Sequence, residues 1–192
     1  RYSDFDRAMM RHALQLAEKA LYLSSPNPRV GCVLTQAKDI IGEGYTQVAG
    51  KNHAEIQALN DACAQGHRTL GATAYVTLEP CSHIGRTPPC TDSLINAGVT
   101  RVVAAMQDPN PLVCGAGFDA LRNAGITVQC GLLEDEAIAL NLGFIQRIVH
   151  SRPWVRLKMA VSLDGKTALN NGQSQWITSA AARHDNQHWR AR

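Results

Sequence analysis

The sequence predicts an α/β protein in which helices cover both faces of a partly parallel sheet, giving three α/β/α layers. Three observations support this fold class. Short apolar runs alternate with segments that have helical periodicity. The composition, 45% hydrophobic and 18% charged, is that of an ordinary globular protein. The chain of 192 residues is long enough for one α/β domain with about forty residues to spare.

The expected elements follow from apolar spacing and from the positions of Gly and Pro. Helices are predicted over residues 4–23, 54–64, 91–97, 115–124, 134–149 and 179–192. Strands are predicted over residues 30–34, 40–45, 73–78, 101–105, 126–130 and 154–161. Because only five residues separate the first two strands, they are expected to form an antiparallel hairpin.

The domain organisation is indicated by Pro153, which interrupts the helical pattern that precedes it. We therefore expect a first domain over residues 1–148, a linker over 149–153, and the beginning of a second domain over 154–192. So short a final segment cannot enclose a core of its own.

The charge pattern bears on possible partners. The formal net charge is +3, and the Lys and Arg residues are not clustered, so no nucleic-acid partner is expected. No run of 18 apolar residues occurs and the first residues do not resemble a signal peptide, so we expect a cytoplasmic protein without a membrane partner. The six cysteines form no dense disulfide framework. Four of them are expected to pack as small apolar side chains, namely Cys32, Cys63, Cys114 and Cys130.

Two clusters of chemically active residues lie at strand-to-helix transitions. His53 and Glu55 begin one predicted helix, whereas Cys81 follows a predicted strand and Cys90 opens the next helix. In an open α/β sheet such loops gather at the carboxyl ends of the strands. One His and two Cys would hold a zinc ion and leave its fourth position open to water, as in catalytic zinc sites. The spacing predicts such a site, with His53, Cys81 and Cys90 as ligands.

Glu55 lies two residues beyond His53. In zinc deaminases a Glu at this spacing is not a ligand but acts as general acid and base. We therefore expect Glu55 to transfer protons during hydrolytic removal of an amino group from a pyrimidine-like ring. The alternative is a closed structural zinc with His83 as fourth ligand, which would leave Glu55 without a role.

The long loop between the two cysteines carries a family resemblance. Eight residues separate Cys81 from Cys90, whereas the general deaminase signature has two. The string 80–90 and the upstream string 27–31 resemble the RibD family of riboflavin-biosynthesis deaminase/reductases, within the cytidine-deaminase-like superfamily. The segments 157–167 and 174–178 resemble the opening of that family's reductase domain.

This resemblance implies a substrate and contacts for the first step. The substrate would be diaminohydroxyphosphoribosylaminopyrimidine, a phosphorylated small molecule, which is deaminated with a zinc cofactor. Asn27, His83 and Arg86 would contact it, and a guanidinium such as that of Arg86 suits a phosphate. The family commonly has a His where this sequence has Thr46. We therefore expect altered affinity at that contact rather than an altered reaction.

The same resemblance implies a second step, reduction of the product's ribosyl group with NADPH in a domain similar to dihydrofolate reductase. It places Ala160 and Trp176 at the NADPH cofactor, and Ser174 and Arg190 at the substrate. A homo-oligomer, either a dimer or a tetramer, is also implied. Two rivals remain: a zinc deaminase acting on a nucleoside or on a base in RNA, and a non-catalytic binding domain with a structural zinc.

Overall fold

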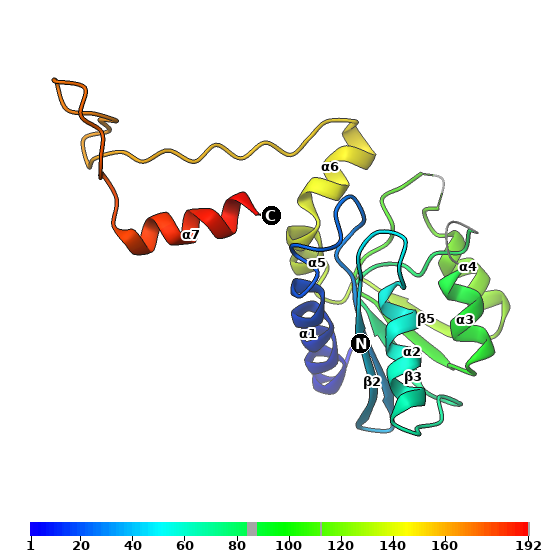
Figure 1. Cartoon of the computed structure of the whole chain (residues 1–192). Helices are drawn as coiled ribbons and strands as arrows, with labels where there is room; N and C mark the ends of the chain where they lie inside the picture. The colour runs from blue at the N-terminus through cyan, green and yellow to red at the C-terminus, as the bar shows by residue number, and fades with distance from the viewer. Residues whose placement is uncertain (84–87, 112, 192) are drawn as a thin grey trace. The chain divides into compact units, whose positions relative to one another are not determined.

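The structure is a computed structural model that describes residues 1–83, 88–111 and 113–191 (Figure 1). It divides into two compact units, Arg1–Pro153 and Trp154–Arg192. The helices are α1 (Asp4–Glu18), α2 (Ala54–Ala64), α3 (Cys90–Asn96), α4 (Ala116–Asn123), α5 (Glu134–Leu140), α6 (Leu142–His150) and α7 (Ala180–Arg190). The strands are β1 (Gly31–Gln36), β2 (Asp39–Tyr45), β3 (Thr73–Val76), β4 (Arg101–Ala104) and β5 (Thr127–Cys130).

The first unit is built around a five-stranded sheet in the order β2-β1-β3-β4-β5. Strand β1 is antiparallel to both β2 and β3, whereas β3, β4 and β5 run parallel to one another. Helices α1 and α5 lie on one face of the sheet, and α2, α3 and α4 lie on the other (Figure 1). The predicted three-layer α/β fold with a mixed sheet and an opening hairpin is confirmed.

Two glycines allow helices to lie unusually close to the hairpin. A Cβ on Gly31 would lie 1.9 Å from the Ala13 carbonyl oxygen of α1, and one on Gly44 would lie 2.2 Å from the Ala54 carbonyl oxygen of α2. Neither position has room for a side chain. The contact at Gly44 fixes the first turn of α2 against β2, and this turn carries His53 and Glu55.

At the other end of the sheet, Asp6 forms a buried polar cluster. Its carboxylate accepts hydrogen bonds from Arg101 Nη1 at 2.7 Å and from the Tyr75 hydroxyl at 2.8 Å. It also caps α1, because Ser3 and Asp6 form a reciprocal capping box. Burial alone would raise the pKa of Asp6, but these hydrogen bonds, led by that of Arg101, hold it well below its ordinary value.

The structure has two helices where the sequence predicted one. The segment 134–149 was expected to be continuous, but α5 ends before Asn141 and α6 begins after it. The Asn141 side chain accepts a hydrogen bond from the Arg29 N–H at 2.8 Å and donates one to the Arg29 carbonyl at 3.0 Å. Asn141 is only 2% exposed. Its hydrogen bonds to a residue distant in the sequence interrupt the helix at this position.

Two further expectations are wrong. Residues 154–161 form no strand, since strand formation needs a partner and none of the described residues pairs with them. Of the four cysteines expected in the core, only Cys32 is buried, whereas Cys63, Cys114 and Cys130 are exposed.

The second unit consists of an irregular segment and helix α7, which Ser179 caps through a 3.2 Å hydrogen bond from the Ala182 N–H. None of its described residues is buried. It contains two cation–π contacts. The Arg183 guanidinium lies 4.1 Å from the Trp176 ring centroid, and that of Arg156 lies 4.2 Å from the Trp189 ring centroid.

Candidate active site and metal centre

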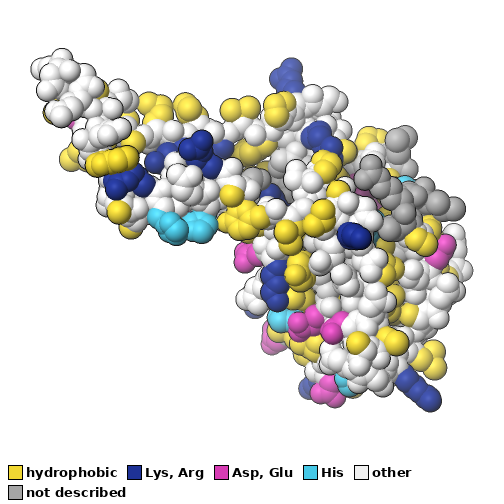
Figure 2. Space-filling model, viewed as in Figure 1, with side chains coloured by type: hydrophobic (Ala, Val, Ile, Leu, Met, Phe, Trp, Pro, Cys, Tyr) yellow, Lys and Arg dark blue, Asp and Glu magenta, His cyan; other side chains and the backbone are white. Residues whose placement is uncertain are grey.

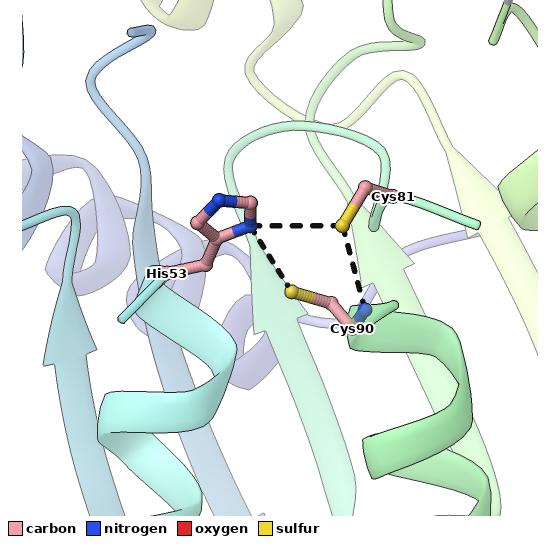
Figure 3. A group of neighbouring side chains, drawn as sticks. All are labelled: His53, Cys81 and Cys90. Atoms are coloured by element: carbon pink, nitrogen blue, oxygen red, sulfur yellow. Dashed lines mark hydrogen bonds between the residues drawn. The ribbon is translucent and has the colours of Figure 1, made fainter. Parts of the chain in front are cut away.

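His53 is held at the first turn of α2. It occupies the N-cap position with extended backbone angles, so its side chain projects beyond the helix end rather than along its flank. Its Nδ1 atom lies 3.6 Å from Cys81 Sγ and 3.3 Å from Cys90 Sγ (Figure 3). The imidazole therefore faces both sulfur atoms.

The two cysteines come from opposite ends of one long loop. Cys81 follows β3, and Cys90 is the first residue of α3. The Cys90 N–H donates a 3.4 Å hydrogen bond to Cys81 Sγ (Figure 3). This N–H lies in the first turn of α3, where the helix dipole favours a thiolate.

The donor set fits a zinc ion. The ligand atoms of His53, Cys81 and Cys90 all lie within 4.8 Å of one another. Tetrahedral bonds of about 2.0 Å to nitrogen and 2.3 Å to sulfur would place those two atoms about 3.5 Å apart. The observed nitrogen to sulfur distances of 3.6 and 3.3 Å lie on either side of that value. His83 is exposed and is not part of this group of described residues, so the geometry does not favour a closed structural site.

Contacts between the three proposed ligands shift their pKa values. Hydrogen bonding with Cys90, followed by that with His53, lowers the pKa of the Cys81 thiol despite its burial. The corresponding bond to Cys81, together with burial, raises the pKa of Cys90. Hydrogen bonding to Cys81 also raises the pKa of His53, although burial opposes this change. The cluster therefore favours one thiolate, the form that binds zinc.

Glu55 lies in the same first turn of α2 as His53 and is only 4% exposed. Burial, followed by the negative charge of Cys81, raises the pKa of Glu55 to about 7. A carboxyl group with that pKa can both accept and donate a proton near neutral pH. The position suits the proton-transfer role that the sequence predicts.

A cavity of about 520 Å³ opens in front of these residues, a size suited to a small ligand. Its lining includes His53, Glu55 and Cys81. Further polar or aromatic residues of its wall are Asn27, Thr46, Lys51, Glu79, His83, Asp108, Asn110 and Phe144.

The predicted deaminase contacts have different outcomes. Asn27 and His83 line the cavity, whereas Arg86 lies outside the described residues. Thr46 also lines the cavity, but its hydroxyl accepts a hydrogen bond from the Val30 N–H at 3.1 Å. It is 4% exposed, so this side chain mainly joins two backbone segments.

The predicted reductase contacts all lie in the second unit. Ala160 is half-buried, and Ser174, Trp176 and Arg190 are exposed. The structure does not bring these four side chains together as a site among the described residues.

Sequence reasoning missed part of the cavity wall. Asp108 and Asn110 lie in the loop after β4, and Lys51 lies just before α2. Burial raises the pKa of Asp108, although a 2.8 Å hydrogen bond from the Asn110 N–H opposes this change. The available signal was topological: the loop after β4 leaves the same sheet edge as the loop after β3, because these strands are parallel.

Basic side chains on the face seen in Figure 2 are scattered among apolar and acidic ones, without a continuous basic stripe in its described part. None of the helices in the described ranges is long and apolar enough to cross a membrane.

Comparisons with known proteins agree with this geometry. Residues 3–106 match the family model of the cytidine and deoxycytidylate deaminase zinc-binding region, and residues 153–192 match that of the RibD C-terminal domain. RibD of Escherichia coli is 55% identical over 186 residues, which cover 97% of this chain and 50% of that protein.

Solved structures give the same result. Acinetobacter baumannii RibD is similar with a TM-score of 0.90 and 53% identity, covering 97% of this chain and 52% of the other. A second similar structure is the Thermotoga maritima diaminohydroxyphosphoribosylaminopyrimidine deaminase/5-amino-6-(5-phosphoribosylamino)uracil reductase. Its TM-score is 0.90 and its identity 43%, and the match covers 95% of this chain and 52% of the other.

The chain thus spans about half the length of the relatives that it matches. The zinc-binding match covers the helix with His53 and Glu55 and both cysteines, and the high identity extends over nearly the whole chain. The chain therefore belongs to the zinc-binding cytidine and deoxycytidylate deaminase family and, within it, to the RibD proteins.

Proposed function

We propose that this chain catalyses the hydrolytic deamination of diaminohydroxyphosphoribosylaminopyrimidine, consuming water and giving 5-amino-6-(5-phosphoribosylamino)uracil and ammonia. The observation that carries the proposal is the cluster of His53, Cys81 and Cys90, of which His53 and Cys81 line a cavity together with the buried Glu55. The similarity to the Thermotoga maritima deaminase/reductase supports the choice of substrate.

The residues have separate roles in this proposal. His53, Cys81 and Cys90 hold the zinc, which when bound supplies a Lewis acid that activates water at neutral pH. Glu55 accepts a proton from the attacking water, protonates the ring nitrogen and then assists departure of ammonia. Its burial keeps bulk water from competing for this proton.

Binding would use the polar wall of the cavity. Asn27 and His83 would contact the pyrimidine and ribose, and Arg86 would contact the phosphate. Lys51 is a further cation on the cavity wall and suits the phosphate end of the substrate. It would offset the loss of the His contact that the family commonly has where this chain has Thr46.

The domain proposal is a deaminase domain over residues 1–148, a linker over 149–153 and the start of an NADPH-dependent reductase domain, similar to dihydrofolate reductase, over 154–192. The division of the structure after Pro153 and the RibD C-terminal match support it. In the whole protein Ala160 and Trp176 would contact NADPH, and Ser174 and Arg190 the product of the first step. A cytoplasmic homo-oligomer completes the proposal, and light scattering would test its oligomeric state.

The decisive experiment measures ammonia release from the phosphoribosylaminopyrimidine, cytidine and an RNA adenosine in parallel. We expect turnover of the first alone. Glu55→Gln should keep its zinc and lose at least about a thousandfold in rate, since it removes the proton carrier. Glu18→Gln, at an exposed position of α1, serves as the matched control. Preference for cytidine or RNA would overturn the substrate assignment, and full activity of the Glu55 variant would overturn the mechanism.

A further inference from the structure

Glu79 is a buried carboxylate at the point where β3 leads into the zinc loop. It is 3% exposed and lies two residues before Cys81. Isolated buried carboxylates are costly unless hydrogen bonds satisfy their oxygen atoms. The contacts of Glu79 are therefore informative about what this position requires.

The hydrogen bonds that the structure shows for Glu79 come from backbone N–H groups. Its Oε2 atom accepts from Asp108 at 3.1 Å and from Gly115 at 3.0 Å. Its Oε1 atom accepts from Gly117 at 2.8 Å and from Phe118 at 3.4 Å. Both oxygen atoms are thus used as acceptors, which suits a carboxylate and does not suit an amide.

Three of these donors belong to the beginning of α4. Gly115 is its N-cap residue, with φ at +85° and no side-chain cap hydrogen bond of its own. The first N–H groups of a helix have no partner inside the helix. Glu79 supplies that partner from a distant strand end, and its negative charge lies at the positive end of the helix dipole.

The packing around this contact leaves no room for a side chain at Gly117. A Cβ on Gly117 would lie 2.0 Å from the Pro80 carbonyl oxygen and 3.1 Å from Glu79 Oε1. Helix α4 therefore contacts the backbone directly before Cys81. The fourth donor, Asp108, belongs to the loop that supplies Asp108 and Asn110 to the cavity wall.

We propose that Glu79 is a positioning residue that fixes the Cys81 zinc ligand and the cavity wall around Asp108 and Asn110 in one relative arrangement. Glu79 lines the cavity, but in this role it acts through the backbone groups that it binds rather than on the substrate. It thereby sets the distance between the reacting centre and the groups that hold the substrate. This inference rests on the proposed deaminase function.

The test compares two buried carboxylates. Glu79→Gln keeps the shape of the side chain but replaces one acceptor oxygen by a donor that faces backbone N–H groups. Asp6→Asn, the control, changes a carboxylate that is 5% exposed and lies in the cluster with Arg101 and Tyr75. Both variants are expected to lower the melting temperature, so stability alone does not distinguish them.

Three measurements do distinguish them: the rate of zinc release to a chelator, the visible absorption spectrum of the Co²⁺-substituted protein, and KM and kcat for ammonia release. For Glu79→Gln we expect roughly tenfold faster zinc release, a shifted Co²⁺ spectrum and a roughly tenfold higher KM, as for residues that orient metal ligands. For Asp6→Asn the rate of zinc release, KM and kcat should stay within about twofold of the wild-type values, and the Co²⁺ spectrum should be unchanged.

Gly117→Ala disturbs the same contact from the helix side and should reproduce the Glu79→Gln pattern. It keeps the test decisive if Glu79→Gln does not fold. If the wild type binds Co²⁺ and releases ammonia while Glu79→Gln and Gly117→Ala behave like Asp6→Asn, the positioning role is overturned alone. If the wild type itself neither binds Co²⁺ nor releases ammonia, the deaminase proposal fails instead.

Discussion

The two units of the chain differ in how their proposed site residues are held. The first unit packs a core on both faces of its sheet, and its zinc cluster lies beside a defined cavity. In the second unit none of the described residues is buried, and Leu163 and Val155 are almost fully exposed. Fixed geometry thus supports the deamination step, whereas motif resemblance alone supports the reductase contacts. Mutations in the two units should therefore differ in effect on deamination.

The largest effect is expected from removal of a zinc ligand. His53→Ala should release the metal and lower deamination by at least about a thousandfold, because the metal activates the attacking water. Metal analysis by mass spectrometry together with an ammonia assay measures both changes. Cys63→Ser is the matched control, since Cys63 is an exposed residue at the other end of α2. Equal loss of activity in both variants would contradict the assignment of the ligands.

The next effect concerns stability and pH. The pKa of Asp6 is lowered in the folded state by hydrogen bonds from Arg101, Ser3 and Tyr75. Its stabilisation is therefore complete above the unfolded pKa of about 3.9 and is lost as the pH falls toward the folded value. At pH 7 Asp6→Asn should cost about 2 to 4 kcal/mol, because it leaves Arg101 without its partner.

Thermal unfolding of both proteins from pH 7 to pH 3 measures this effect, with a chelator present so that loss of zinc does not contribute. The difference between wild type and Asp6→Asn should be constant down to about pH 5 and shrink below about pH 4. A difference that grows with acidity would show that another group controls the transition.

A smaller effect is expected at the cavity wall. Lys51→Met should raise KM for the phosphorylated substrate about tenfold with little change in kcat, since one phosphate contact is worth about 1.4 kcal/mol or more. Added salt should weaken binding by the wild type more than by the variant. Lys38→Met, in the exposed turn between β1 and β2, provides the control. An unchanged KM would remove Lys51 from the phosphate site.

The smallest effect is expected in the second unit. Trp176→Ala removes a ring that contacts Arg183 within that unit, so zinc content and deamination should change less than about twofold. The ammonia assay used for His53→Ala measures this as well. A large loss of deamination would show that the first step depends on the second unit, and the contrast between the units would no longer hold.

Sequence patterns were informative where local rules determine structure. Helix α2 occupies Ala54–Ala64 as predicted, because apolar spacing defines it and His53 precedes it at the cap. The order of strands along the chain and the meeting of the two motifs followed from the α/β alternation in the same way.

Other features depend on contacts between distant residues, which no local pattern reveals. Asn141 ends α5 because its side chain bonds the backbone of Arg29, and Glu79 caps α4 from the end of β3. The exposure of Cys63 and Cys130 likewise depends on which face of an element the final packing covers. For residues 154–161, strand character in the sequence was not sufficient, since a strand needs a neighbour.

The cavity wall formed by Asp108, Asn110 and Phe144 lies beyond residues 3–106, the part that matches the zinc-binding family model. The zinc ligands, Glu55 and the wall residues Asn27, Lys51 and His83 all lie within the matched stretch. Substitutions at Asn110 or Phe144 would therefore reshape one side of the cavity without replacing a zinc ligand, the proton carrier or the cationic side of the wall.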